Sequence, residues 1–309
     1  MRIVFLGSGA FAIPSLLSLL DAGHDVVALV TQPDRERGRG QELAPPPTKP
    51  AAIARGVPVL QPRRVKEPEA IAELRRLAPE LQVVVAYGQI LPRAVIDLAP
   101  RGTVNVHASL LPRLRGAAPI QWAIARGDRE TGVTTMLIDE GLDTGPTLLA
   151  RATPIGPDET AADLEPRLAR LGAEVLLETV RGLADGSLRP TPQDHTRATL
   201  APLLEKEDGR LDWTRPAPDL ANRVRGFHPW PGTFAIWREK TLKVLKARAE
   251  AAGPAAPGTI LTADGAGLLV ACGEGTALRV LEVQPESRRA MAASAFASGQ
   301  HVRTGDRLA

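Results

Sequence analysis

The sequence predicts two domains: an α/β domain with a Rossmann-like, mostly parallel sheet and helices on both faces, followed by a smaller β-barrel domain. Through the first 180 or so residues, short apolar runs alternate with helical patterns, which is typical of parallel strands joined by crossover helices. After residue 207 short β-like runs follow one another closely, separated by glycine, proline and aspartate. A chain of 309 residues with 44% hydrophobic residues is long enough to bury two cores.

The elements of the first domain follow from these patterns in chain order. Strands are expected at 3–6, 26–30, 57–60, 83–87, 104–107 and 133–138, and helices at 11–20, 48–54, 68–77 and 117–125. A long helical pattern covers 158–186, and Pro166 inside it predicts either a later helix start or a kink. Residues 188–206 read as a linker, so the domains are predicted to cover 1–187 and 207–309.

The second domain is expected to begin with a helix and to continue as a run of strands. The helix is expected at 218–225, and the strands at 233–237, 241–247, 258–262, 268–271 and 278–283. Closely spaced strands without crossover helices are typical of a small barrel.

The loop after the first strand, Gly7-Ser-Gly9-Ala-Phe-Ala12, matches the dinucleotide-binding fingerprint in its Gly/Ala form. That fingerprint also needs an acidic residue at the end of the second strand, where this chain reads Thr31-Gln32-Pro33. Asp25 lies at the opposite end of that strand. We therefore expect no NAD, and we interpret the glycines as a tight turn that lets the strand and helix pack closely.

The strand that ends at residue 107 carries two polar residues, Asn105 and His107, which share one face because they are two positions apart. An amide N–H can bind a developing oxyanion, and an imidazole can move a proton near neutral pH. Downstream, a glycine-bounded loop presents Asp143, and a carboxylate beside a histidine can orient the ring. These residues suit chemistry at a carbonyl, although a lone Asn-x-His pair or a lone turn aspartate is more often structural.

Charge is distributed unevenly along the chain. Residues 1–207 carry 24 basic and 25 acidic side chains, whereas residues 208–309 carry 14 and 10. This excess hints at a polyanionic partner, and chance explains it equally well. Residues 33–50 hold three arginines and five prolines without an apolar period, which predicts a long loop. Lys243 and Lys246 differ in parity, so a regular strand would place them on opposite faces.

Several long motifs carry a resemblance to a known family. NVHASLLPRLRGAAPIQWAI, followed by TGVTTMLIDEGLDTGP, resembles the active-site signature of the folate-dependent formyltransferases. The segments RIVFLGSGAFAIPSL, TQPDRERGRG, VVVAYGQILP, GRLDW and FHPWPGT are also similar to that family. The resemblance covers nearly all residues, and it is strongest to the members that act on initiator methionyl-tRNA.

The resemblance implies formyl transfer from 10-formyltetrahydrofolate to the α-amine of methionine on initiator tRNA. It implies Asn105, His107 and Asp143 as the catalytic residues. The expected folate-pocket residues are Ser109, Leu110, Leu111, Pro112, Gln89, Ile90 and Leu91. It also makes the second domain an OB-like barrel that binds tRNA, as such barrels commonly bind nucleic acid.

The 33–50 segment becomes, by the same resemblance, the loop that reaches the tRNA acceptor end. The expected tRNA-binding residues are Arg35, Arg37, Arg39, Lys243 and Lys246. Two alternatives stay open: a formyltransferase acting on a nucleotide-sugar or glycinamide ribonucleotide amine, and a non-catalytic RNA-binding protein. No metal is expected, because His107 has no second histidine or cysteine at ligand spacing.

The composition indicates the cellular compartment in which the protein is expected. The single cysteine, Cys272, excludes an internal disulfide framework and fits a reducing environment. No apolar run approaches the roughly 20 residues that span a bilayer, and the N-terminus shows no signal-peptide pattern. We expect a cytoplasmic location and a monomer.

Overall fold

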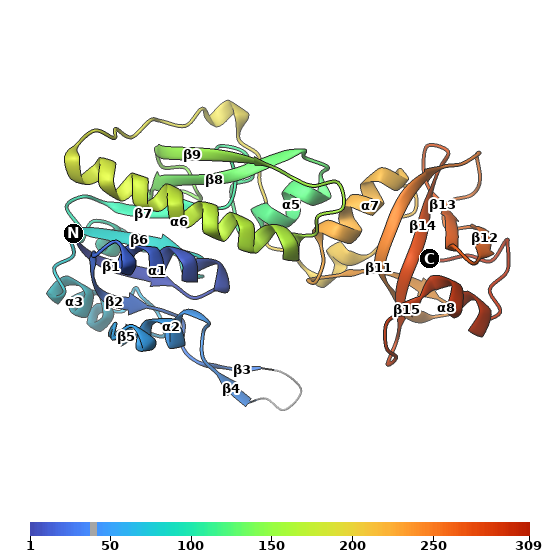
Figure 1. The fold of residues 1–309 in the computed structure, drawn as a ribbon, viewed down its shortest axis with the longest axis horizontal. Coiled ribbons are helices and arrows are strands. Elements are labelled where there is room, and N and C mark those ends of the chain that lie inside the picture. The colour runs from blue at the N-terminus through green and yellow to red at the C-terminus, as the bar shows by residue number, and fades with distance from the viewer. Residues whose placement is uncertain (38–41) are drawn as a thin grey trace. The chain divides into compact units, whose positions relative to one another are not determined.

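The computed structural model describes residues 1–37 and 42–309, which divide into two compact units (Figure 1). Unit 1 comprises Met1–Gly116, Thr131–Thr153 and Glu165–Ala201, and unit 2 comprises Ala117–Glu130, Pro154–Leu164 and Pro202–Ala309. Two short segments that precede residue 165 therefore belong to unit 2. The sequence-based boundaries at 187 and 207 stay a prediction.

Unit 1 is built on a seven-stranded sheet in the order β5-β2-β1-β6-β7-β8-β9. The β2–β5, β1–β2, β1–β6 and β6–β7 pairs are parallel, and β7–β8 is antiparallel. The strands are β1 (Arg2–Gly7), β2 (Asp25–Val30), β5 (Val59–Leu60), β6 (Leu81–Val85), β7 (Thr103–His107), β8 (Glu130–Leu137) and β9 (Thr147–Pro154). The expected mostly parallel sheet is confirmed.

Helices cover both faces of this sheet. On one face, Val4 and Leu6 of β1 form a buried cluster with Leu74 and Val95. On the other face the long α6 approaches β7 so closely that a Cβ on its Gly172 would lie 3.0 Å from a methyl of Val106. The helices concerned are α1 (Ile13–Asp21), α2 (Thr48–Ala54), α3 (Pro68–Arg76), α4 (Arg93–Ile96) and α6 (Ala161–Asp185).

Pro166 does not interrupt α6. The helix begins at Ala161 and contains Pro166 close to its start. Because proline has no N–H, one i→i−4 hydrogen bond near the helix start is missing. The predicted late start is therefore wrong, and a kink at Pro166 stays a prediction.

The turn after β1 is tight, as the sequence predicts. A Cβ on Gly7 would lie 2.7 Å from the Phe5 ring and 2.9 Å from the Val85 carbonyl oxygen. The Thr48 hydroxyl donates to the Gly7 carbonyl at 2.9 Å, and the Thr31 hydroxyl donates to the Ser8 hydroxyl at 3.1 Å. Glycine is required here because neighbouring backbone and side chains leave no room for a side chain.

The predicted long loop at 33–50 contains regular structure at both of its described ends. β3 (Arg35–Arg37) and β4 (Glu42–Ala44) form a two-stranded antiparallel ladder, and α2 begins at Thr48. None of the helices in the described ranges has the length and apolar character needed to cross a membrane.

Unit 2 contains an antiparallel sheet in the order β10-β11-β14-β13-β12, with β15 paired to β14. The strands are β10 (Thr233–Trp237), β11 (Lys240–Ala251), β12 (Ile260–Asp264), β13 (Gly267–Ala271), β14 (Thr276–Pro285) and β15 (Met291–Ala292). One buried cluster unites sheet residues such as Leu242 and Val280 with Leu220 of α7 (Ala217–Gly226) and Phe296 of α8 (Ala293–Gly299). The predicted second domain of closely spaced strands is confirmed, and its strands form an antiparallel sheet that is compatible with the expected barrel.

The tail at 305–309 lies between the two outer strands of this sheet order. Ala309 exchanges both backbone hydrogen bonds with Ile236 of β10, at 2.6 and 3.0 Å. On the other side, the Leu308 N–H donates to the Gly258 carbonyl, and Ile260 donates to Asp306 at 2.8 Å. The tail thus links β10 to β12, which is the arrangement of a sheet that curls towards a barrel.

The helix α5 (Pro119–Ala125) belongs to unit 2 because it packs against α7. The Trp122 and Phe227 rings meet edge to face, with centroids 5.4 Å apart. A Cβ on Gly226 would lie 2.8 Å from the Ala125 nitrogen, so the two helices touch backbone to backbone at this glycine. The sequence pattern predicts that α5 is a helix. Its packing against α7 was not predictable, because α7 lies far away in the chain.

Candidate active site

β7 carries Asn105 and His107 at its carboxyl end, and it lies between β6 and β8 in the sheet. Asn105 lies in register with Val84 of β6 and Met136 of β8, and His107 lies opposite Thr134 of β8. Asn105 is half-buried, whereas His107 is only 6% exposed. The predicted position of the pair, at the sheet edge where α/β proteins bind ligands, agrees with the structure.

The His107 ring is held from both of its nitrogens. Nε2 lies 2.9 Å from the Leu114 carbonyl oxygen, and Nδ1 lies 3.6 Å from Oδ2 of Asp143. Because a carbonyl can only accept, Nε2 must carry the hydrogen and donate it to Leu114. Nδ1 is therefore the nitrogen that can gain or release a proton on the side of Asp143.

Asp143 is presented by a loop between β8 and β9 that folds around Asp139. Oδ1 of Asp139 accepts hydrogen bonds from the Gly141 N–H at 3.0 Å and from the Thr144 hydroxyl at 2.6 Å. Asp143 has a positive φ of 51°, a conformation that aspartate tolerates better than most residues. Its Oδ2 accepts the Gly116 N–H at 2.8 Å, so the carboxylate is anchored beside His107.

Ser109 and Gln89, two of the predicted pocket residues, use their side chains to brace the backbone. The buried Ser109 hydroxyl donates to the Arg113 carbonyl at 2.6 Å. Oε1 of Gln89 accepts the Val65 N–H at 2.8 Å. Each side chain fixes a turn near the site, and contact with folate stays a prediction for both.

The apolar pocket residues differ in their exposure. Leu110, Leu111 and Pro112 are half-buried in the turn that follows β7. Ile90 is 93% exposed, whereas its neighbour Leu91 is buried in the core. An isoleucine that projects fully into solvent from a loop is available for an apolar ligand, while Leu91 contributes to packing.

Sequence reasoning missed the residues that hold the catalytic candidates. The carbonyl of Leu114 fixes His107, the N–H of Gly116 fixes Asp143, and Gln193 donates to the backbone of the Asp143 loop. Gln193 lies in the proline-rich stretch that was interpreted as linker, where no periodicity marks it. Polar side chains that bond to distant backbone atoms leave no pattern in the local sequence.

The basic residues of the 33–50 segment are only partly described. Arg35 is exposed in β3, and its Nη2 donates to Oε1 of Gln32 at 3.1 Å. Arg37 ends the same strand, and Arg39 lies outside the described residues. The tRNA-binding role of all three stays a prediction.

Lys243 and Lys246 share one face of β11, contrary to the expectation for a regular strand. The register shifts between Val244 and Lys246, which leaves Leu245 as a bulge. Lys243 then lies opposite Gln284 and Lys246 opposite Glu282, two residues of β14 that share a face because they are two positions apart. The bulge adds one residue to β11, so the side chains that follow it point to the face opposite to the one expected for a regular strand. Both lysines are exposed.

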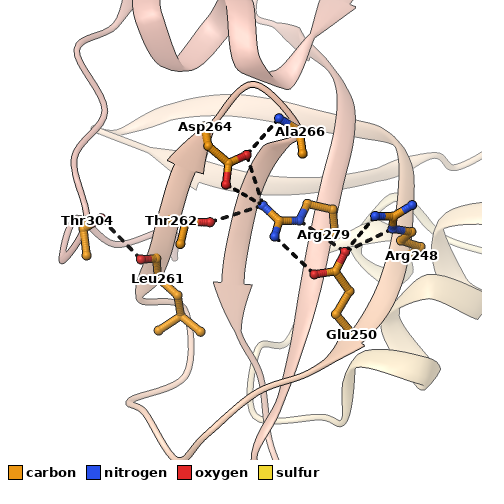
Figure 2. A network of polar contacts seen from close by, with 8 residues as sticks. All are labelled: Arg248, Glu250, Leu261, Thr262, Asp264, Ala266, Arg279 and Thr304. Carbon is orange, nitrogen blue, oxygen red and sulfur yellow. Dashed lines mark hydrogen bonds and ion pairs between the residues drawn. The ribbon is translucent and has the colours of Figure 1, made fainter.

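Two other basic residues of unit 2, Arg248 and Arg279, are paired with carboxylates. Figure 2 shows Arg279 of β14 between Glu250 and Asp264, with Arg248 on the other side of Glu250. The Arg279–Glu250 and Arg279–Asp264 ion pairs measure 3.1 and 3.3 Å. Two arginines and two carboxylates cancel, so this network ties strands together and adds little to the basic surface.

Within residues 1–37 and 42–309, no group of three or more histidine, cysteine, aspartate or glutamate side chains is arranged to hold a metal ion. The site itself offers one imidazole and one carboxylate. That no metal and no NAD are used stays a prediction.

Two family models and a sequence relative point to the same family. The family model described as formyl transferase matches residues 1–180, and the one described as formyl transferase, C-terminal domain, matches residues 203–301. A methionyl-tRNA formyltransferase from Solibacter usitatus is 54% identical over 309 residues, covering 100% of this chain and 98% of the relative. Because the match covers nearly the full length of both proteins, it includes both units of this chain.

Solved structures of lower identity show the same fold. HypX from Aquifex aeolicus in complex with tetrahydrofolic acid superimposes with a TM-score of 0.63 at 18% identity, covering 99% of this chain and 48% of HypX. An N-formyltransferase from Helicobacter canadensis, in complex with folinic acid and dTDP-3-aminofucose, gives a TM-score of 0.68 at 16% identity, covering 92% of this chain and 99% of that protein.

Proposed function

From the premise that the chain belongs to the methionyl-tRNA formyltransferase family, we propose that it transfers the formyl group of 10-formyltetrahydrofolate to the α-amine of methionyl initiator tRNA. The observation that carries the chemistry is the placement of His107 Nδ1 3.6 Å from the Asp143 carboxylate, with Asn105 on the same face of β7. This combines an amide donor with a positioned proton carrier.

The reaction begins when the neutral amine attacks the formyl carbon, which is bonded to a folate nitrogen. The carbonyl oxygen then becomes an oxyanion, and the Asn105 amide N–H donates to it. Asn105 is suited to this task because β7 is paired with β6 on one side and with β8 on the other. The sheet therefore holds the amide in place before the substrate binds.

Proton transfer completes the step. His107 can use only Nδ1, because Nε2 donates to Leu114. The 3.6 Å separation of Nδ1 and Asp143 Oδ2 is longer than a hydrogen bond, so Nδ1 can bond to a substrate group or to a water molecule that lies beside the pair. Protonated Nδ1 donates to the leaving folate nitrogen, and the Asp143 side receives the proton that the amine loses. One proton leaves the amine and one reaches the folate.

The acceptor is assigned to tRNA on two grounds. The 54% identical relative carries that name over its whole length, whereas the sugar-formylating neighbour is 16% identical and shares only the fold. The exposed Lys243 and Lys246 on one face, together with Arg35, Arg37 and Arg39, supply positive charge for a phosphate backbone. A nucleotide-sugar or nucleotide amine is therefore the less favoured acceptor. A cytoplasmic location and a monomeric state remain predictions.

The test is to incubate the protein with methionyl-tRNA and 10-formyltetrahydrofolate, and to measure formylated methionine by mass spectrometry. Asn105→Ala, His107→Ala and Asp143→Ala are each expected to lower turnover by about 10²-fold or more, the scale for losing an oxyanion donor or a positioned acid–base group. Circular dichroism checks that each variant is folded. Turnover near wild type in all three would refute this mechanism, and preference for a sugar amine would refute the acceptor.

A further inference from the structure

We infer that Gln193 is a positioning residue for the reaction: it holds the Asp143 loop and the turn after β7 together, so that the carboxylate faces His107. The inference rests on the proposed function, since formyl transfer is the reaction whose rate it sets. Gln193 belongs to unit 1, as do both segments that it joins.

The Gln193 amide uses its complete hydrogen-bonding capacity. Its Nε2 donates to the carbonyl oxygens of Asp143 and Gly145, at 2.9 and 2.7 Å. Its Oε1 accepts from Nη2 and Nε of Arg115, at 2.7 and 3.2 Å. An amide has two donors and two acceptor sites, and all four are occupied. With the residue only 8% exposed, these bonds are shielded from water.

Arg115 connects Gln193 to the two backbone groups that hold His107 and Asp143 in place. It is buried at 6% exposure and lies between Leu114, whose carbonyl accepts from His107, and Gly116, whose N–H donates to Asp143. Any shift of Arg115 therefore moves the anchors of both His107 and Asp143. Gln193 thus acts on the pair from two directions: from the loop that carries Asp143, and from the turn that fixes His107.

The rest of the segment reinforces the same attachment. The Arg115 N–H donates to the Thr199 carbonyl at 2.8 Å, and the Ala201 N–H donates to the Arg115 carbonyl at 2.7 Å. The Thr199 hydroxyl accepts the Leu114 N–H at 2.9 Å. On the other side, Thr191 exchanges two backbone hydrogen bonds with Thr147, the first residue of β9. The 191–201 segment is therefore attached at both ends, and Gln193 provides its contact with the Asp143 loop.

The decisive substitution is Gln193→Glu. Glutamate has nearly the same size and can still accept from Arg115, but when ionised it has no hydrogen to donate to Asp143 and Gly145. We expect kcat to fall by about 10-fold to 100-fold, because a small displacement of a catalytic group costs that much. The KM values for formyl donor and methionyl-tRNA should change little, since Gln193 contacts neither in this arrangement. Thr196→Ala is the matched control, because its side chain is exposed and donates to nearby Asp194.

A double-mutant cycle separates positioning from general support of the fold. If Gln193 acts through Asp143, Gln193→Glu should cost little further kcat in an Asp143→Asn background. If its effect there is as large as in the wild type, the inference is overturned. Gln193→Met, which lacks all four hydrogen bonds, is measured beside it, with melting temperatures for every variant. A kcat near wild type for folded Gln193→Glu and Gln193→Met also overturns the inference.

Should Gln193→Glu and Gln193→Met both fail to fold, Gln193→Asn replaces them in the cycle, because an amide one carbon shorter stays polar but cannot reach both Arg115 and the Asp143 loop. A fall in kcat that vanishes in the Asp143→Asn background supports the inference, and an unchanged kcat overturns it. The proposed function is judged separately by the wild type: without formyl-methionine in that reaction the function fails, whatever the variants do.

Discussion

Gly116 illustrates how one residue without a side chain determines the active-site geometry. Its φ is +120°, and a Cβ would lie 2.6 Å from the Ala201 carbonyl oxygen. Its N–H donates to Asp143. The backbone conformation, the close approach and the hydrogen bond all depend on the absence of a side chain.

Gly116→Ala should therefore lower both stability and turnover. The matched control is Gly186→Ala, which also has a positive φ, of 75°, but would meet nothing within 4 Å. The control is expected to cost about 1 kcal/mol of unfolding free energy from backbone strain alone. Gly116→Ala should cost more, and kcat should fall because the Gly116 N–H moves away from Asp143. Thermal melts and the formylation assay check both expectations; equal melting temperatures for the two variants would contradict the steric argument.

Tyr87 is the only tyrosine of the chain, which makes its ionisation directly observable. Burial raises the pKa of Tyr87 to about 12, and among the described residues its hydroxyl has no hydrogen-bond partner. In the unfolded chain a tyrosine ionises near pH 10. The folded state therefore binds its proton more tightly, so this group reduces stability as the pH rises above about 10.

Ultraviolet absorbance of tyrosinate should remain low at pH 11 in the folded protein and rise fully in denaturant. Tyr87→Phe serves as the blank, and it should leave stability at pH 7 unchanged or raise it by up to about 1 kcal/mol, because it removes an unpaired buried hydroxyl. Its stability relative to wild type should increase further above pH 10. Titration of the folded protein near pH 10 would show that the hydroxyl is accessible.

At the scale of elements, the Arg279 network joins β11, β14 and β12. Arg279, which donates hydrogen bonds to the Glu250 carboxylate, lowers the pKa of Glu250 below its ordinary value. A carboxylate with a lowered folded pKa adds stability above the pKa of the unfolded chain, about 4.3. This contribution is lost as the pH falls from there through the folded pKa.

Glu250→Gln is expected to lower the melting temperature at pH 7, and the difference from wild type should shrink as the pH falls below about 4.3. Glu286→Gln, at an exposed position, provides the control and should follow wild type at every pH. Calorimetric scans across this range make the measurement. A constant difference between Glu250→Gln and wild type at all pH values would exclude the ionic contribution.

The sequence predicts those elements whose burial follows a simple period. The limits of α2 at Thr48–Ala54 and of β10 at Thr233–Trp237 agree with the predicted limits. β9 and α8 were not predicted. β9 exposes alternate residues and has few large apolar side chains, and α8 consists mostly of alanine, serine and glycine. Weak apolar content gives little periodic signal, even where tertiary contacts stabilise the element.

The site was predictable where it depends on local geometry. The two-residue spacing of Asn105 and His107 places both on one face of β7, and this requires only that 103–107 be a strand. Asp143 could be linked to them only through the family resemblance. The Leu245 bulge and the contacts of Gln193 were not predictable, because both depend on partners far away in the chain.

At the scale of the whole molecule, the proposed tRNA contacts of unit 2 predict a salt-dependent affinity. Lys243→Ala combined with Lys246→Ala should raise the KM for methionyl-tRNA and leave that for the formyl donor unchanged. Each lost phosphate contact reduces the slope of log affinity against log salt by about one unit. The loss should be similar for different tRNAs, because phosphate contacts do not read sequence.

The exposed Lys66 of unit 1 provides the comparison. Lys66→Ala should retain the wild-type salt slope, measured as KM across a series of salt concentrations. A double lysine variant with the same slope as wild type would show that this face of β11 does not contact the polyanion.

The tail that links β10 to β12 has a consequence for association between molecules. The backbone N–H groups of Ile236 and Ile260 donate to the carbonyl oxygens of Ala309 and Asp306. When residues 305–309 detach, these groups face solvent on two strand edges. Such edges can pair with another chain. The docked tail therefore protects unit 2 against edge-to-edge aggregation, and its detachment is the step at which neighbouring molecules compete with it.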